Sequence, residues 1–166
     1  MNDPAKHYVN SSARERLIEH LFLADILREL WKRGIHDPEV LRSEVDNAGY
    51  DLVIGVGTIV RHIQLKSSVS TAKTAKQSVN VKLMEKPSGC VVWTELDENT
   101  IQIGPFRWFG SLPGNPLPSI LDYPITKHTK GNKDGVKTER PNLRDLAKGK
   151  FEVVKTMSQL VEKLFG

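Results

Sequence analysis

The sequence lacks three features that would each define a class of protein. It has a single cysteine, Cys90, which excludes an internal disulfide and zinc sites built from paired cysteines. It has no run of about 18 apolar residues, the length that a membrane-spanning helix needs. Its first ten residues contain no apolar signal core. Together these absences predict a cytoplasmic protein that does not contact the membrane.

What is present is an ordinary globular composition. The 166 residues are 39% hydrophobic and 27% charged, which fits one domain with a real core. Residues 1–10 are predicted to form a loose leader. Residues 110–142 form a long excursion rich in Gly, Pro and Lys, and part of it must pack or clamp a ligand, since long structureless loops are rare in compact domains.

Acidic residues are unevenly distributed. Residues 1–51 contain ten Asp/Glu and seven Lys/Arg, whereas residues 52–94 contain one acid, Glu85, and six Lys/Arg. Residues 123–150 contain eight Lys/Arg and three acids. Basic segments of this kind suit a polyanion such as DNA, although a solvated surface has the same composition.

Periodicity and turn signals predict the elements. A helix is expected over residues 12–32, with Ser12 and Glu15 as a capping box and an apolar arc that includes Leu27 and Trp31. A last helix over residues 157–165 is expected to be capped by Thr156. The expected strands are residues 40–45, 50–54, 59–66, 90–96, 100–103 and 151–154, with a mobile stretch at 67–78 and a helix at 79–86. This order is typical of a mixed α/β (α+β) domain with one central sheet.

Three polar side chains are expected to meet at one end of a hairpin. Gln64 and Lys66 share a face of their strand because side chains alternate. The Gly55–Thr58 turn brings Asp51, at the start of the preceding strand, beside them. A carboxylate and an amide oxygen are ligands for Mg²⁺, and an ammonium group can neutralise charge on a phosphate. The pattern therefore predicts phosphodiester hydrolysis, although Gln and Lys two apart on a strand are also common on a solvent face.

The long helix offers one further acid. At 100° per residue, Glu19 lies in line with Leu23, Ile26 and Leu30 on the buried side. A carboxylate there needs a metal ion or a salt bridge. Glu19 is therefore predicted to reach the site, with a salt bridge to Lys66 or to a nearby Arg as the alternative.

These residues, in this order, resemble the PD-(D/E)xK nuclease superfamily, in a variant with Q-x-K. The resemblance rests on Glu19, on residues 49–54 (GYDLVI) and on residues 63–68 (IQLKSS), and it covers about half of the chain. It implies the restriction-endonuclease-like fold, with a central mixed sheet flanked by helices in the order helix, three strands, helix, strand. It also implies Mg²⁺- or Mn²⁺-dependent cleavage of DNA.

The resemblance implies a role for each matching residue. Asp51, Gln64 and Glu19 would hold the metal ion, and Lys66 would be the catalytic lysine. Tyr50 stands where the family has proline, and Gln64 is neutral where most members have an acid. A catalytically inactive module that binds nucleic acid or a partner protein, in a defence or repair system, is therefore the second hypothesis. A homodimer is expected if both strands of a duplex are cut.

Weaker candidates surround this core. Ser67, Ser68, Lys73 and Lys76 are placed to contact a DNA backbone, with a plain strand end and a solvated loop as alternatives. Glu44 and Asp46 precede Asp51 and are better explained as turn residues. His20 is expected in the core, whereas His62 shares the face of Gln64 and Lys66. The aromatic residues at 106, 108 and 109 suit a core or an oligomer contact better than base stacking.

Overall fold

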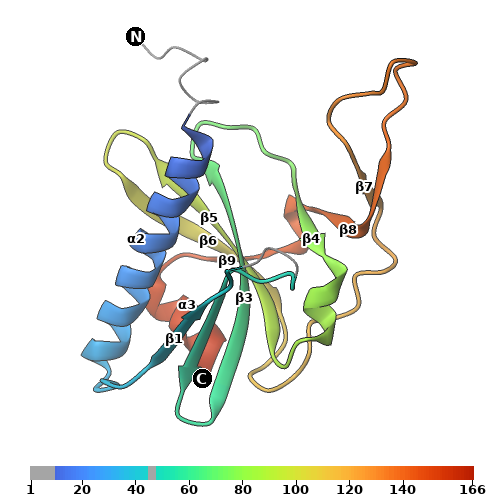
Figure 1. The fold of residues 1–166 in the computed structure, drawn as a ribbon. Helices are drawn as coiled ribbons and strands as arrows, with labels where there is room; N and C mark the ends of the chain where they lie inside the picture. The colour runs from blue at the N-terminus through green and yellow to red at the C-terminus, as the bar shows by residue number, and fades with distance from the viewer. Residues whose placement is uncertain (1–9, 45–47) are drawn as a thin grey trace.

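The centre of the protein is a six-stranded mixed sheet in the order β1-β2-β3-β5-β6-β9. The computed structural model describes residues 10–44 and 48–166 (Figure 1). Neighbouring strands run antiparallel except β3 and β5, which are parallel. The predicted fold class, mixed α+β with a central mixed sheet and helices, is confirmed. The strands are β1 Glu39–Arg42, β2 Leu52–Val56, β3 Ile59–Val69, β5 Gly89–Asp97, β6 Gln102–Gly110 and β9 Glu152–Val154.

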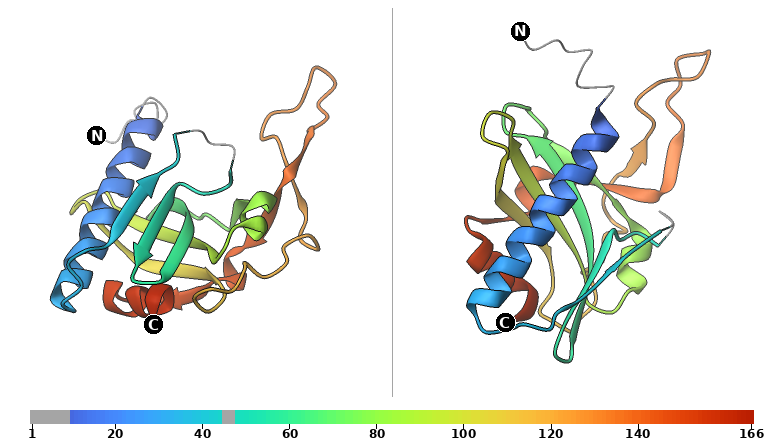
Figure 2. Two further views of the ribbon diagram at one scale, coloured as in Figure 1. Left: turned by 60° about the horizontal axis from the view of Figure 1, so that its bottom comes forward. Right: turned by 60° about the vertical axis from the view of Figure 1, so that its left-hand side comes forward.

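Two α-helices cover one face of this sheet, α2 Ser11–Lys32 and α3 Met157–Phe165 (Figure 2). Phe22 and Ile26 of α2 and Leu160 of α3 pack in one apolar cluster with Ile63 of β3 and Val92 of β5. At roughly 25 cal/mol per Å² of buried apolar surface, such contacts dominate the stability of the fold.

A smaller sheet lies against the other face. It contains β4 Lys76–Asn80, β8 Glu139–Ala147 and β7 Ile125–Lys127, in that order. Two 3₁₀ helices accompany it, η1 Val81–Glu85 and η2 Lys148–Lys150. The second apolar cluster joins the two sheets and consists of Val79, Leu83, Val91, Trp93, Leu117, Ile120, Leu146 and Phe151.

The start and the buried face of α2 differ from the prediction. The helix begins at Ser11 with Asn10 as N-cap, and no side chain caps it, so the predicted capping box of Ser12 and Glu15 is wrong. The helix packs through four residues spaced four apart: Ile18, Phe22, Ile26 and Leu30. This spacing turns the apolar arc away from Leu27 and Trp31, which are 36% and 62% exposed.

The segment between β3 and β5 also differs. Residues 67–78 were expected to be mobile, yet β3 continues to Val69 because it pairs with β5 as far as Leu96, and β4 begins at Lys76. The helix predicted over 79–86 is a strand end followed by the 3₁₀ helix η1. Val79 and Leu83 are both buried, so their four-residue spacing imitates a helix although β4 pairs with β8.

The other predicted elements vary in outcome. The strand expected at 40–45 is shorter, and the strand expected at 100–103 begins later and is longer, as β6. The packing expected somewhere within 110–142 is confirmed by buried Leu117 and Ile120. The cap of α3 is confirmed, since Thr156 Oγ1 accepts from Gln159 N at 3.2 Å. The leader to residue 9 and the turn residues 45–47 lie outside the described residues. No α-helix in the described part of the chain has the length and apolar character to span a membrane.

Candidate active site

The site forms where β2 ends and β3 continues. The ladder between them runs from the Val56–Ile59 pair to the Leu52–Ile63 pair, and Asp51 N donates to Ile63 O at 2.9 Å. Beyond this point the next main-chain donor of β3 bonds to a side chain and not to β2: Leu65 N donates to Asp51 Oδ2 at 2.7 Å. The Asp51 carboxylate is therefore held against the edge of β3, as the hairpin argument predicted.

Gln64 is oriented by the smaller sheet. Its side chain is only 7% exposed, and its Oε1 accepts from Asn80 N at 3.2 Å. Because a main-chain N–H can only donate, this bond fixes which end of the amide faces β4. Asn80 in turn accepts from Lys82 N through its side chain, which begins η1.

Lys66 lies with these two residues in an open cleft of about 960 Å³. One wall is the amino-terminal half of α2, the base is β3, and the other wall comes from the small sheet. The lining residues are Ser12, Glu15, Arg16, Ile18, Glu19, Asp51, Gln64, Leu65, Lys66, Ser67, Gln77, Ser78, Asn80, His128, Glu139, Arg140, Pro141, Asn142 and Leu143.

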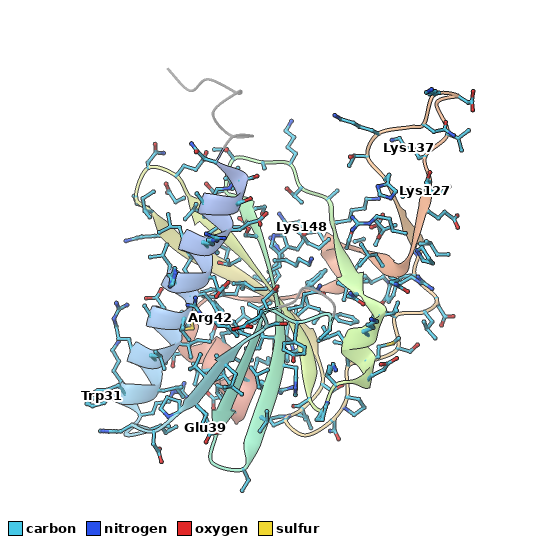
Figure 3. The ribbon with its side chains drawn as sticks, viewed as in Figure 1. Trp31, Glu39, Arg42, Lys127, Lys137 and Lys148 are labelled. Atoms are coloured by element: carbon cyan, nitrogen blue, oxygen red, sulfur yellow. The ribbon has the colours of Figure 1, made fainter. Side chains whose placement is uncertain are left out.

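Glu19 reaches this cleft from α2. It also forms an ion pair with Arg42, whose Nε lies 3.2 Å from Glu19 Oε1, and Figure 3 shows Arg42 beside the helix. Glu19 thus lines the cleft, as helix phase predicted, and it also forms the salt bridge to a nearby Arg that was the alternative. His20 is exposed and its Nδ1 lies 3.1 Å from Arg42 Nη2, so the prediction of a core histidine is wrong.

The donor chemistry suits a hard divalent cation. Asp51 and Glu19 supply carboxylate oxygens and Gln64 an amide oxygen, the ligand types that Mg²⁺ prefers. Each of these oxygens has two lone pairs, so a single hydrogen bond does not exhaust it. Within residues 10–44 and 48–166 no three His, Cys, Asp or Glu side chains cluster as metal ligands. A cation here therefore depends on the Gln64 amide as its third protein ligand.

The structure separates the weaker candidates. Ser67 lines the cleft, whereas Ser68 Oγ accepts from Trp93 Nε1 at 2.9 Å. Lys73 is exposed between β3 and β4, and Lys76 forms an ion pair with Asp145.

Among the described residues, Glu44, His62 and Cys90 do not line the cleft. Glu44 is exposed and lies outside the lining, and Asp46 is not among the described residues. His62 packs against Tyr50 and its Nδ1 lies 2.8 Å from Pro87 O. Cys90 is buried, and burial raises the pKa of its thiol to about 12, so it is not a nucleophile at neutral pH.

Several lining residues were not predicted. Asn80 carries no sequence signal, since its role comes from its main-chain N–H. Arg16 stands one helical turn before Glu19, and this spacing was a usable signal. His128, which follows β7, and Arg140 of β8 line the cleft, and Thr126 of β7 pairs with Arg140. The only sequence feature that indicated His128 and Arg140 was the high content of Lys and Arg in residues 123–150.

The small sheet is tied together by a buried carboxylate. Asp145 Oδ1 accepts from Thr126 Oγ1 at 2.6 Å and from Ser78 Oγ at 2.9 Å, and Oδ2 binds Lys76. Burial alone would raise the pKa of Asp145, but hydrogen bonds from Lys76, Thr126 and Ser78 outweigh it, and the pKa is lowered. Strands β4, β7 and β8 are thus joined at one point.

This carboxylate predicts a pH-dependent contribution to stability. A lowered pKa means that the contribution is complete above the ordinary value of about 4 and is lost as pH falls through the folded-state value. We expect Asp145→Asn to lower the free energy of unfolding by about 1 to 3 kcal/mol at neutral pH. The difference from wild type should shrink below about pH 4. Urea denaturation of both proteins across pH tests this, and a difference that stays constant down to pH 2 contradicts it.

Comparisons with known proteins give one structural match to report. No protein-family model matches the chain, and no curated protein matches it. Among solved structures the chain is similar to the bacterial homing endonuclease I-Ssp6803I, with 21% identity over 72% of this chain and 82% of that one. The TM-score is 0.31, which is too low to support an argument, so the functional assignment depends on the cleft itself.

Proposed function

We propose that this protein is a metal-dependent endonuclease that hydrolyses DNA phosphodiester bonds. The observation that carries the proposal is the meeting of Asp51, Gln64 and Lys66 in one cleft, at the point where β2 stops pairing with β3. Glu19 lines the same cleft from α2. Acidic, amide and ammonium groups at a strand edge form a site for a cation and a phosphate together.

Each residue has a distinct task in this proposal. Asp51, Gln64 and Glu19 would hold Mg²⁺ or Mn²⁺, and the hydrogen bonds from Leu65 N and Asn80 N keep the first two oriented. When bound, such an ion would supply activation of a water molecule and neutralisation of phosphate charge. Lys66 donates to the phosphoryl oxygens on which negative charge develops, or orients the attacking water.

Metal titration of cleavage tests the proposal. Wild type should nick plasmid or cut single-stranded DNA in Mg²⁺ or Mn²⁺ and not in excess chelator. Asp51→Asn keeps the acceptor for Leu65 N but removes a charge, so we expect it to need about tenfold more metal for half-maximal cleavage. Asp37→Asn, an exposed change before β1, is the control. Absence of cleavage by clean wild type at any metal concentration would refute the proposal.

A second function is favoured by two specific observations. The Glu19 carboxylate is already paired with Arg42, and the third oxygen ligand, Gln64, is neutral. Both weaken a cation site, and a nuclease-fold module without catalysis would tolerate them. Such a module would bind nucleic acid or a partner protein in a defence or repair system. This second function predicts that the affinity for DNA is the same with metal and with chelator, and that DNA is not cleaved.

Homodimerisation belongs to the proposed function as well. One cleft cuts one strand, so a double-strand break is simplest with two copies. Light scattering with and without a DNA duplex measures the stoichiometry directly.

A further inference from the structure

The feature that the proposed chemistry leaves unused is a projecting basic arm, residues 125–140. It consists of β7, the start of β8 and the loop between them, and this loop extends away from the rest of the molecule; Lys127 and Lys137 lie on the arm (Figures 1 and 3). It contains five Lys/Arg and two acids, Asp134 and Glu139. The five cations are Lys127, Lys130, Lys133, Lys137 and Arg140, and all are exposed.

The cations of the arm differ in their ion pairing from the lysines at the base of the small sheet. Within the described ranges 10–44 and 48–166, no Asp or Glu forms an ion pair with any of the five. By contrast, Lys76 and Lys148, at the base of the small sheet, are paired with Asp145 and Glu95. Positive charge without an ion pair in the described part of the chain is therefore present along the projecting arm.

The arm is nevertheless built as a defined structure. His128 N donates to Thr138 O at 2.9 Å and Asn132 N to Val136 O at 2.9 Å, so the pairing continues beyond β7. The Asn132 side chain accepts from Asp134 N and Val136 N at the tip. The chain turns so tightly there that a Cβ on Gly131 would lie 2.7 Å from Gly135 main-chain atoms. Such a turn fixes the main chain that carries the lysines before a ligand arrives, which lowers the entropic cost of binding.

The position of the arm relates it to the cleft. His128, Glu139 and Arg140 at its base form the cleft wall opposite α2. The buried Asp145 network ties this base to β4, which also orients Gln64 through Asn80. A phosphodiester strand held at Lys66 would therefore continue past Arg140 toward the lysines of the arm.

We propose that the basic arm is a clamp for the sugar–phosphate backbone of duplex DNA on the far side of the cleft from α2. This inference rests on the proposed function for the identity of the ligand. The charge density of duplex DNA, one phosphate per roughly 1.7 Å of axis, suits a group of exposed lysines that have no ion pair with a described residue. The clamp supplies affinity and not sequence recognition, since contacts to phosphate carry no base information.

Binding without catalysis tests the clamp. The protein is titrated into a short labelled DNA duplex in chelator over a range of salt concentrations. The arm variant carries Lys130→Gln, Lys133→Gln and Lys137→Gln. The control variant carries Lys32→Gln, Lys155→Gln and Lys163→Gln, which removes the same charge near the carboxyl end of α2 and around α3. Of the control residues only Lys163 has an ion pair within the described chain, an exposed one with Glu152 that contributes little to stability.

We expect the arm variant to bind about tenfold or more weakly near 0.1 M salt, with a slope of log K against log salt that is smaller by about 2 to 3. The control should change both quantities much less. Equal weakening of the two variants, unchanged binding by the arm variant, no duplex binding by wild type, or an arm-dependent affinity for duplex RNA but not DNA would each overturn the proposal. Thermal melting of all three proteins checks that they are folded.

The two proposals fail separately. Arm-dependent binding without metal-dependent cleavage would refute the nuclease and support the clamp. Cleavage by wild type with arm-independent binding would refute the clamp and leave the nuclease intact.

Discussion

Lys66→Ala is expected to reduce metal-dependent DNA cleavage by about 100-fold to 1,000-fold, the effect of removing one donor that stabilises transition-state charge. Lys66 lines the cleft two residues after Gln64, on the same face of β3. Its ammonium group is the side-chain cation that the proposed reaction places at the scissile phosphate, beside the metal ion. The measurement is the initial rate of plasmid nicking at saturating Mn²⁺.

Two further variants make this result specific. Lys155→Ala removes an exposed lysine beside α3 and should cleave as wild type does. Lys66→Arg keeps the charge but changes the geometry of its donors, so it should retain part of the activity. Binding of the Lys66→Ala protein to duplex DNA in chelator should fall only slightly, because the loss is expected in the chemical step. Equal rates for Lys66→Ala and wild type would exclude Lys66 from catalysis and show that the cleavage comes from elsewhere.

Arg61→Met is expected to lower the free energy of unfolding by about 3 kcal/mol or more. Arg61 is fully buried on β3, yet its partners are carbonyl oxygens and not a carboxylate. Its Nε donates to Leu164 O at 2.7 Å, and its Nη2 donates to Lys163 O and Ser111 O, both at 2.9 Å. Lys163 and Leu164 lie in the last turn of α3, where carbonyls lack partners within the helix and a cation is favourable.

The matched control is another arginine that holds α3. Arg33 donates to Ser158 O at 2.7 Å at the amino-terminal end of the helix, but it does so on the surface. Arg33→Met should therefore cost less than about 1 kcal/mol. Arg61→Lys keeps the charge with fewer donors in a fixed arrangement and should recover part of the loss. Guanidinium denaturation of the three variants gives the comparison. If Arg61→Met and Arg33→Met are equally stable, the hydrogen bonds from Arg61 to the last carbonyls of α3 do not stabilise the protein.

The central part of the site was predictable because it depends on local rules. A two-residue turn, Gly57-Thr58, fixes the register of β2 against β3, and that register brings Asp51 to the end of the ladder beside Leu65. Alternation then puts Gln64 and Lys66 on one face. The phase of α2 identified Glu19, although the cap that was used to start the helix was wrong.

Other parts were not predictable because distant segments decide them. Strand β4 pairs with β8 through the register of Lys76 with Ala147, a partner some seventy residues away. The local pattern around Val79 and Leu83 favoured a helix, and that long-range ladder overrode it. Arg61 lies on the same apolar face of β3 as Ile63, which is a sequence signal, but only the packing of α3 supplies the carbonyls that explain a buried arginine there.

The sequence by itself determined the mixed α+β class, the hairpin and the meeting of Asp51 with the Gln64-x-Lys66 strand, because neighbouring residues set turns, alternation and helix phase. Tertiary structure decided what surrounds them. It brought Arg42 to Glu19, the Asn80 N–H to Gln64 and the basic arm to the far wall of the cleft. The physical reason is that a polar side chain takes whichever donor or charge the packed chain brings within about 3 Å, and that partner is set by contacts between elements far apart in sequence.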